Sequence, residues 1–196
     1  MNKKSKKIAQ YSALALAASA VLPMACTKDK EADDPNIVHR DINSTITSTV
    51  STPNVVDSID INLDGIYDVG FAVYSSASGT AAVIGEINNS AFLYCDTTTA
   101  FGPTKFIHAS GEDFTAPTIY ASTKWRTIGA IDVDIPPKVG GISGQGDKFF
   151  SFAILIGIKP FHGWLRVNLS SDKKTFVVKD LAYSVLPNTP IKTGAQ

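Results

Sequence analysis

From about Val55 onward, apolar and polar residues alternate over many short segments of the chain. Successive side chains of a β-strand point to opposite faces, so this period of two predicts strands with one buried face. The alternating apolar sets are Ile59, Ile61 and Leu63, followed by Val69, Phe71 and Val73. Further extended segments are predicted at residues 82–87, 91–95, 105–108, 127–133, 149–158, 164–169 and 175–183.

Residues 149–158 differ from the other extended segments because they are almost continuously apolar. Ten residues are too few to span a bilayer, which needs about 20, so a central strand buried on both faces is predicted. Turn-forming Gly, Pro, Asn and Asp residues separate the segments, and no capped amphipathic helix of three turns is recognisable after the N-terminal 25 residues. The pattern therefore predicts an all-β fold, a single β-sandwich or jelly-roll domain over residues 54–196.

The first 25 residues have the composition of an export signal. Four lysines within the first seven residues precede an uncharged run, 8–22, which is rich in Ala, Leu and Val and short for a membrane span. With the small residue Ala25 before Cys26, this segment resembles a bacterial lipoprotein signal peptide. That resemblance implies cleavage after residue 25 and membrane anchoring through a lipidated Cys26. Pro23 departs from the family pattern, which usually has Leu there. The alternative is an ordinary secretory signal with an incidental cysteine, and both alternatives predict export.

Residues 26–53 are predicted to be a tether. Residues 27–34 are densely charged, cannot bury apolar surface and are expected to stay solvated. They also resemble the acidic, lysine-containing export signal of Bacteroidota surface lipoproteins, and the alternative is a simple hydrophilic spacer. Residues 43–53 are rich in Ser and Thr, which predicts either a linker or a first edge strand.

The balanced formal charge hides an asymmetry. The chain has 18 Lys and Arg and 18 Asp and Glu, but four of the lysines lie in the predicted signal peptide. Without them, 14 basic residues face 18 acidic ones, a net charge of −4. No basic surface for nucleic acid is therefore expected. Two cysteines exclude a disulfide-rich scaffold, and Cys95, among apolar neighbours, is predicted to be a buried thiol.

The C-terminal quarter carries a second resemblance. Residues 161–167 (FHGWLRV), 176–183 (FVVKDLAY) and 187–194 (PNTPIKTG) are similar to the closing strands of exported bacterial β-sandwich proteins. About 35 residues are covered and the motifs are loose. The resemblance supports the fold and transfers no activity.

One motif points to chemistry: residues 60–68 match the pattern D-x-N-x-D-G-x-x-D. Calcium takes six to eight oxygen ligands, and alternate side chains of a tight loop can point inward toward one ion. Glycine at the sixth position of the motif permits the sharp turn that such a loop needs. The predicted ligands are the side chains of Asp60, Asn62, Asp64 and Asp68 and the backbone carbonyl of Ile66.

The motif resembles the first nine positions of an EF-hand and the short calcium loops of dockerins and thrombospondin repeats. Its twelfth position is Phe71, where an EF-hand has a bidentate Glu, and the segment after the motif has a strand pattern. A calcium-bound turn between strands is therefore expected, with a further oxygen from Asp57 or from elsewhere in the fold. The alternative is an Asx-rich hairpin loop without metal.

Other candidate residues carry weaker signals. His39, His108 and His162 lack the spacing of zinc ligands. Asp132 and Asp134 flank Val133 and share one strand face, as a pair of glycosidase carboxylates would, although solvated acids on a strand face are the commoner case.

These observations predict a non-enzymatic, lipid-anchored protein of the outer membrane, exposed at the cell surface if the charged stretch is an export signal. Its calcium-stabilised β-sandwich would be a binding or structural module, with the membrane and a glycan or envelope protein as partners. One alternative is a lectin-like carbohydrate-binding protein with exposed Trp125, Tyr120 or Tyr74 as its platform. Another is a glycoside hydrolase that uses Asp132, Asp134 or Glu112.

Overall fold

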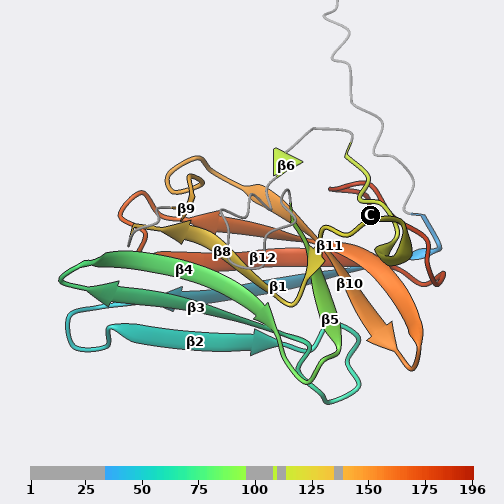
Figure 1. Cartoon of the computed structure of the whole chain (residues 1–196), viewed down its shortest axis with the longest axis horizontal. Coiled ribbons are helices and arrows are strands. Elements are labelled where there is room, and N and C mark those ends of the chain that lie inside the picture. Colours follow the sequence, from blue (N-terminus) through green and yellow to red (C-terminus); the bar gives the residue numbers. More distant parts are fainter. Residues whose placement is uncertain (1–33, 96–107, 110–113, 135–138) are drawn as a thin grey trace, which may run out of the picture. The chain divides into compact units, whose positions relative to one another are not determined.

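The computed structural model describes residues 34–95, 108–109, 114–134 and 139–196 (Figure 1). The predicted signal peptide and Cys26 lie outside these residues. No helix within the described ranges is long and apolar enough to cross a membrane.

The described chain forms two antiparallel β-sheets, which confirms the predicted all-β sandwich. In the larger sheet the strand order is β1 (Ile37–Thr47), β12 (Thr175–Ser184), β11 (Lys159–Leu169), β10 (Lys148–Ile156), β5 (Ala91–Tyr94) and β7 (Trp125–Arg126), and β6 (His108–Ala109) also pairs with β10. In the smaller sheet the order is β2 (Asn54–Ile59), β3 (Val69–Ser76), β4 (Gly79–Glu86), β8 (Ile128–Val133) and β9 (Val139–Gly140). A single 3-10 turn, η1 (Ile119–Ala121), interrupts the described strands.

The core lies between the facing sides of the two sheets. Val69, Phe71 and Val73 of β3 are buried there, as their alternation predicts. The Phe71 ring packs against Phe176 of β12, with 5.5 Å between the ring centroids. Burial of this apolar surface is the main force that holds the two sheets together.

β10 is the central strand that the continuous apolar run predicts. Residues 149–154 are all buried, and the strand pairs with β11 on one side and with β5 and β6 on the other. It ends at Ile156, two residues earlier than predicted, because Gly157 has φ +66° and turns the chain into β11. Ile158 therefore lies in a turn, where 88% of its surface is exposed.

Two segments outside the strands, around Ala116 and Ile191, partly cover the outer face of the larger sheet. Trp125, Tyr94 and Ala116 pack with Ala153 of β10. Near the C-terminus, Trp164 packs with Phe149, Ala182, Ile37 and Ile191, and its indole N–H donates to the carbonyl of Ala195 at 3.1 Å. This cover explains why β10 is apolar on both faces.

The predicted tether over residues 26–53 is wrong for residues 37–47, which form β1. This strand pairs with β12 from Ile37 opposite Ser184 to Thr47 opposite Thr175, so the folded domain begins well before residue 54. The edge-strand alternative is confirmed for residues 43–47, where Ile46 is buried against the core. A register shift between Asp41 and Ser44 interrupts the ladder, a device that blunts an exposed sheet edge.

The other predicted strands differ from the observed ones by at most five residues at either end, and the largest difference is at the start of β11. The exception is 105–108: residues 105–107 lie outside the described ranges, and β6 begins at His108.

Candidate functional site

The D-x-N-x-D-G-x-x-D motif forms the loop between β2 and β3. Asp60 organises its first half: Oδ1 accepts the backbone N–H of Leu63 at 2.7 Å and of Asp64 at 3.3 Å. Oδ2 of the same side chain accepts the N–H of Gly65 at 2.8 Å. Leu63 and Gly65 have φ of +62° and +89°, the backbone conformation that wraps these amides around one carboxylate. Leu63 is thus a loop residue with 69% exposure, and the prediction that it continues a buried strand face was wrong.

Two further side chains complete the tip of the loop. Oδ1 of Asn62 accepts the N–H of Asp64 at 3.1 Å, and Nδ2 of Asn62 donates to Oδ2 of Asp64 at 3.0 Å. Oδ1 of Asp64 accepts the N–H of Ile66 at 2.9 Å. These are Asx turns, in which short polar side chains hold their own backbone.

Asp68 occupies a different environment from the other motif residues. It is only 2% exposed, and its Oδ2 accepts the N–H of Ile61 at 2.8 Å. Burial raises the pKa of the Asp68 carboxyl, hydrogen bonds from Ile61 and Ser90 oppose that rise, and the charges of Asp64 and Asp60 add to it. The Asp68 carboxylate therefore fastens the base of the loop.

Arg40 of β1 supports the loop from outside, and sequence reasoning did not find it. Its Nη1 donates to the carbonyl of Asp60 at 3.0 Å and of Ile61 at 2.8 Å. These bonds tie β1 to the point where β2 ends. No local sequence pattern indicates this contact, because Arg40 lies 20 residues before the loop. Asp57, the predicted source of a further oxygen, instead accepts a hydrogen bond from Ser44 Oγ at 2.5 Å.

The donor atoms at the tip suit a hard cation, since they are all oxygens. Oδ2 of Asp60 accepts one backbone N–H and keeps a second lone pair for an ion, whereas Oδ1 already accepts two. Asp60, Asn62, Asp64 and the carbonyl of Ile66 would hold the ion, and water would complete the six to eight ligands that calcium needs. The carboxylates of Asp60, Asp64 and Asp68 do not come together within 4.8 Å of one another. Among the described residues, one group of three His, Cys, Asp or Glu side chains does, and it lies away from this loop.

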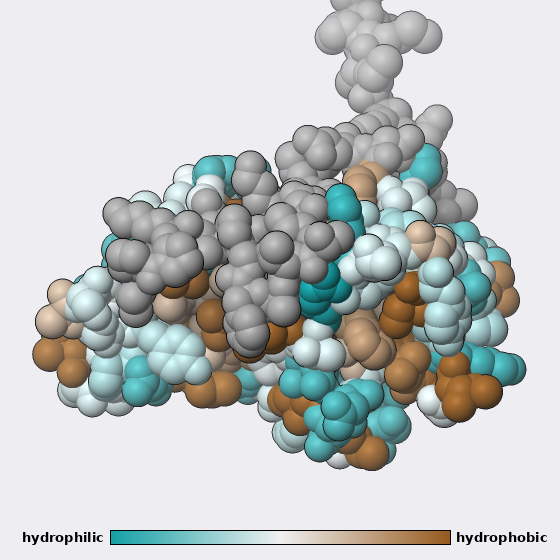
Figure 2. Space-filling model, in the orientation of Figure 1, coloured by the Kyte–Doolittle hydropathy of each residue, from teal (hydrophilic) through white to brown (hydrophobic). Residues whose placement is uncertain are grey.

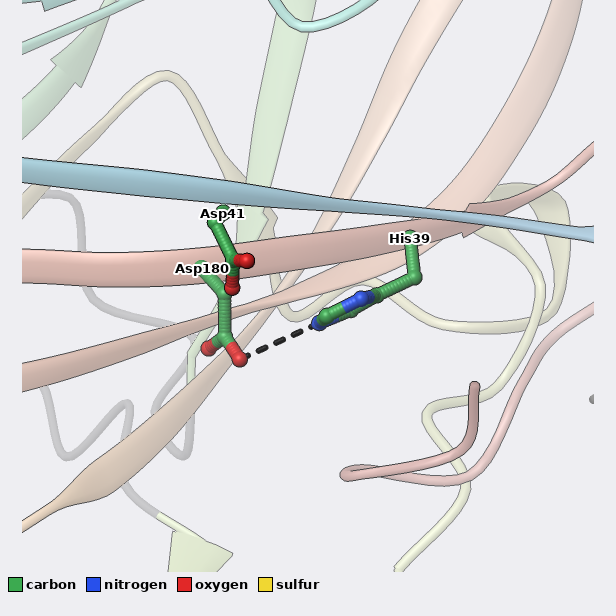
Figure 3. Close-up of side chains that lie close together, drawn as sticks. All are labelled: His39, Asp41 and Asp180. Atoms are coloured by element: carbon green, nitrogen blue, oxygen red, sulfur yellow. Dashed lines mark hydrogen bonds and ion pairs between the residues drawn. The ribbon is translucent and has the colours of Figure 1, made fainter.

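That group is His39, Asp41 and Asp180, on neighbouring positions of β1 and β12 (Figure 3). Asp180 is buried, and Arg166 forms a bidentate ion pair with it: Nε lies 2.8 Å from Oδ1 and Nη2 lies 2.6 Å from Oδ2. Nε2 of His39 lies 3.1 Å from the same Oδ2. Because a guanidinium already engages both oxygens of Asp180, this cluster is an ion-pair network, and a metal ion would have to displace Arg166.

Asp132 and Asp134 converge on one cation, the ammonium of Lys173 in the β11–β12 turn. Nζ of Lys173 lies 2.8 Å from Asp132 and 2.6 Å from Asp134. The hydrogen bonds to Asp132 and Asp134 raise the pKa of Lys173, so it stays charged. Asp132 is buried and also accepts the N–H of Ser143, so it is a structural ion pair and does not lie on a solvated face. Glu112, the third candidate acid, lies outside the described residues.

The three aromatic residues predicted as a sugar platform do not form one. Trp125 is buried, with its ring centroid 5.3 Å from that of Tyr94. Tyr120 and Tyr74 are exposed, but Tyr120 belongs to η1 over the larger sheet and Tyr74 to β3 of the smaller one.

The histidines and Cys95 are separate from the loop. His162 is buried beside Trp125, and burial lowers the pKa of its imidazole, which the nearby Asn188 side chain partly opposes. Cys95 is fully buried as predicted, and its thiol donates to the carbonyl of Leu93.

Comparisons with known proteins add no assignment: no family model, no curated protein and no solved structure matches this chain.

Proposed function

We propose that this chain is a lipid-anchored protein of the bacterial outer membrane whose β-sandwich binds calcium in the β2–β3 loop and is a non-enzymatic binding or structural module. The observation that carries the calcium proposal is the arrangement around Asp60. Its carboxylate gathers the N–H groups of Leu63, Asp64 and Gly65, and so bends the chain into a tip lined with oxygens.

Electrostatics support the same proposal. Asp60 and Asp64 place two carboxylates within five residues, and hydrogen bonds from neutral backbone amides leave their net charge in place. A cation at the tip would relieve their repulsion and stiffen the loop. Magnesium is expected to bind less well, because it dehydrates reluctantly and demands an octahedral site.

The anchor proposal rests on the N-terminal pattern. The lysine-rich start, the apolar run and Cys26 precede a charged stretch, and the strands begin soon after it at Ile37. A folded domain that starts about ten residues after a lipidated cysteine is compatible with a short, hydrophilic spacer at a membrane surface.

A calcium titration of thermal unfolding tests the binding site. Extracellular calcium modules have Kd values of roughly 10⁻⁴ to 10⁻³ M, so millimolar calcium is expected to stabilise the wild type by about 1 kcal/mol, a rise in Tm of a few degrees. Asp64→Ala is expected to lose this response. The matched control is Asp172→Ala, an exposed Asp that also accepts a backbone N–H in a tight turn, and it is expected to keep the response. Equal calcium shifts in all three proteins, or none in the wild type, would show that the motif is only a turn.

Membrane partition tests the anchor. The wild type is expected in the detergent phase with a lipid-modified Cys26 peptide by mass spectrometry, and Cys26→Ser is expected in the aqueous phase or uncleaved. Equal partition of the two proteins would refute lipidation.

A further inference from the structure

The loops at one end of the sandwich carry most of its exposed large apolar side chains. The β10–β11 turn and the segment after β12 lie at the same end, since β11 pairs with β12 from Gly163 opposite Tyr183 and Ile37 pairs with Ser184. The β2–β3 loop of the smaller sheet also lies there, because Arg40 of β1 donates to its carbonyls. Among the described residues, the exposed apolar side chains of this loop end are Leu63, Ile66, Tyr67, Ile156, Ile158, Val185 and Leu186. Figure 2 shows hydrophobic surface gathered at the lower right of the molecule, where Figure 1 places the β10–β11 turn.

These side chains lie on the tips of loops rather than in a groove. Ile158 is 88% exposed and follows Gly157, which has positive φ, and Leu63 is 69% exposed and itself has positive φ. Neither side chain contributes to the core. Water-exposed apolar tips from separate loops at one end of a domain are the arrangement expected of a surface that meets another apolar phase.

The described chain also begins at this end. Asp34 and Asn36 lie beside the end of β12, where the carbonyl of Asn36 accepts the N–H of Val185 at 2.8 Å. Eight residues lead from Cys26 to Asp34, a reach of at most about 28 Å when fully extended. β1 alone has 11 residues and spans about 34 Å toward the opposite end of the sandwich. An anchor at Cys26 is therefore too short to hold the domain upright with its opposite end on the bilayer, but it reaches the loop end easily.

We propose that the loop end of the sandwich rests on the membrane that carries the anchor, with the apolar tips of the β2–β3 loop and β10–β11 turn inserted into the bilayer interface. This orientation rests on the proposed lipidation of Cys26. The partner is the lipid surface itself, and the opposite end, with the β1–β2 connection, faces away from it.

Charge at the loop end indicates which kind of lipid surface fits. Four acidic residues at this end, Asp34, Asp60, Asp64 and Glu86, are accompanied by three basic ones, Arg40, Lys159 and Lys192, so the end carries no excess of positive charge. Attraction to anionic headgroups therefore does not hold this end down, and apolar insertion is the contact. The contact is expected to form on zwitterionic lipid and to persist at high salt, which screens charges but not apolar burial.

Depth-dependent quenching tests the orientation. The lipidated full-length protein is reconstituted in phosphatidylcholine vesicles that contain nitroxide-labelled lipid, with bimane attached through Ile158→Cys, Leu63→Cys or, as the matched control, Val50→Cys. Val50 is 99% exposed in the β1–β2 connection at the opposite end, and native Cys95 is buried from the reagent.

We expect the labels at positions 158 and 63 to lose most of their fluorescence, unchanged in molar sodium chloride, and the label at position 50 to keep it. Equal quenching at both ends, or quenching at neither, with lipid present on Cys26 would overturn the orientation and leave the anchor standing. A chain found without lipid on Cys26 would refute the anchor and the orientation together.

Discussion

Acidic residues in two regions of this protein are stabilised by different partners. In the β2–β3 loop, Asp60 and Asp64 accept hydrogen bonds from backbone N–H groups. On the larger sheet, Asp180 is held by the guanidinium of Arg166. A guanidinium cancels the charge of its carboxylate, whereas backbone amides fix its position and leave the charge. The comparison teaches that pattern and geometry together distinguish a carboxylate available to a metal ion from one that belongs to the framework.

Lys173, like Arg166, pairs a fixed positive charge with acidic side chains. Its ammonium lies between Asp132 and Asp134, the two acids that the sequence predicted on one strand face. The carboxylates of a glycosidase would have to be free of such a fixed cation. This charge pairing is structural, because Lys173 joins the β11–β12 turn to Asp132 of β8 and to Asp134 just after it.

The largest effect is expected from breaking the Arg166 pair. Arg166→Leu leaves the buried Asp180 carboxylate beside His39 and the like-charged Asp41. An uncompensated buried charge is expected to lower the free energy of unfolding by about 3 kcal/mol. Urea unfolding at neutral pH measures it. Arg166→Leu combined with Asp180→Asn is expected to recover part of the loss. A decrease in the free energy of unfolding of less than about 1 kcal/mol would show that this ion pair contributes no more than an exposed surface pair.

A smaller loss is expected at the base of the loop. Asp68→Ala leaves the buried N–H of Ile61 without its acceptor, which lowers the free energy of unfolding by about 2 kcal/mol. Asp68→Asn keeps an acceptor and is expected to lose less. Both variants are expected to keep the calcium response, because Asp68 lies inside the fold and not at the tip. Loss of that response in Asp68→Asn would make Asp68 a ligand after all.

The smallest effect is a dependence on pH that arises from the same residue. Burial raises the pKa of Asp68 above its ordinary value of 3.8 in the folded chain. A carboxyl with a raised folded pKa binds protons more tightly when folded, so its contribution to stability is complete below the unfolded pKa and is lost as pH rises through the folded pKa.

Relative to Asp68→Asn, the wild type is therefore expected to lose stability as pH rises from about 4 toward neutrality. Unfolding of the two proteins without calcium, compared over that range, measures the difference. A difference that stays constant, or a wild type that gains stability instead, would contradict the raised pKa.

Local patterns of apolar residues predicted most of the strands. Alternation at Val69, Phe71 and Val73 and the continuous apolar run of β10 placed these strands, because strand burial repeats every two residues or fills both faces. The same local logic failed at Leu63, where the apolar alternation continued past the end of β2 into a loop of positive φ. Hydrophobic periodicity does not report backbone handedness, so the alternation alone did not mark the end of β2; the turn-forming residues of the acidic motif did.

The sequence by itself determined the β-sandwich class, the central strand and the acidic loop, because each depends on residues close together in the chain. Only the tertiary structure decided that residues 37–47 are a strand, since their partner, β12, lies more than 120 residues away. It also decided that Asp68 is buried, that Arg40 supports the loop and that Lys173 joins Asp132 to Asp134. These contacts depend on which strands become neighbours when two sheets bury a common core, and a pattern read along one segment cannot contain that information.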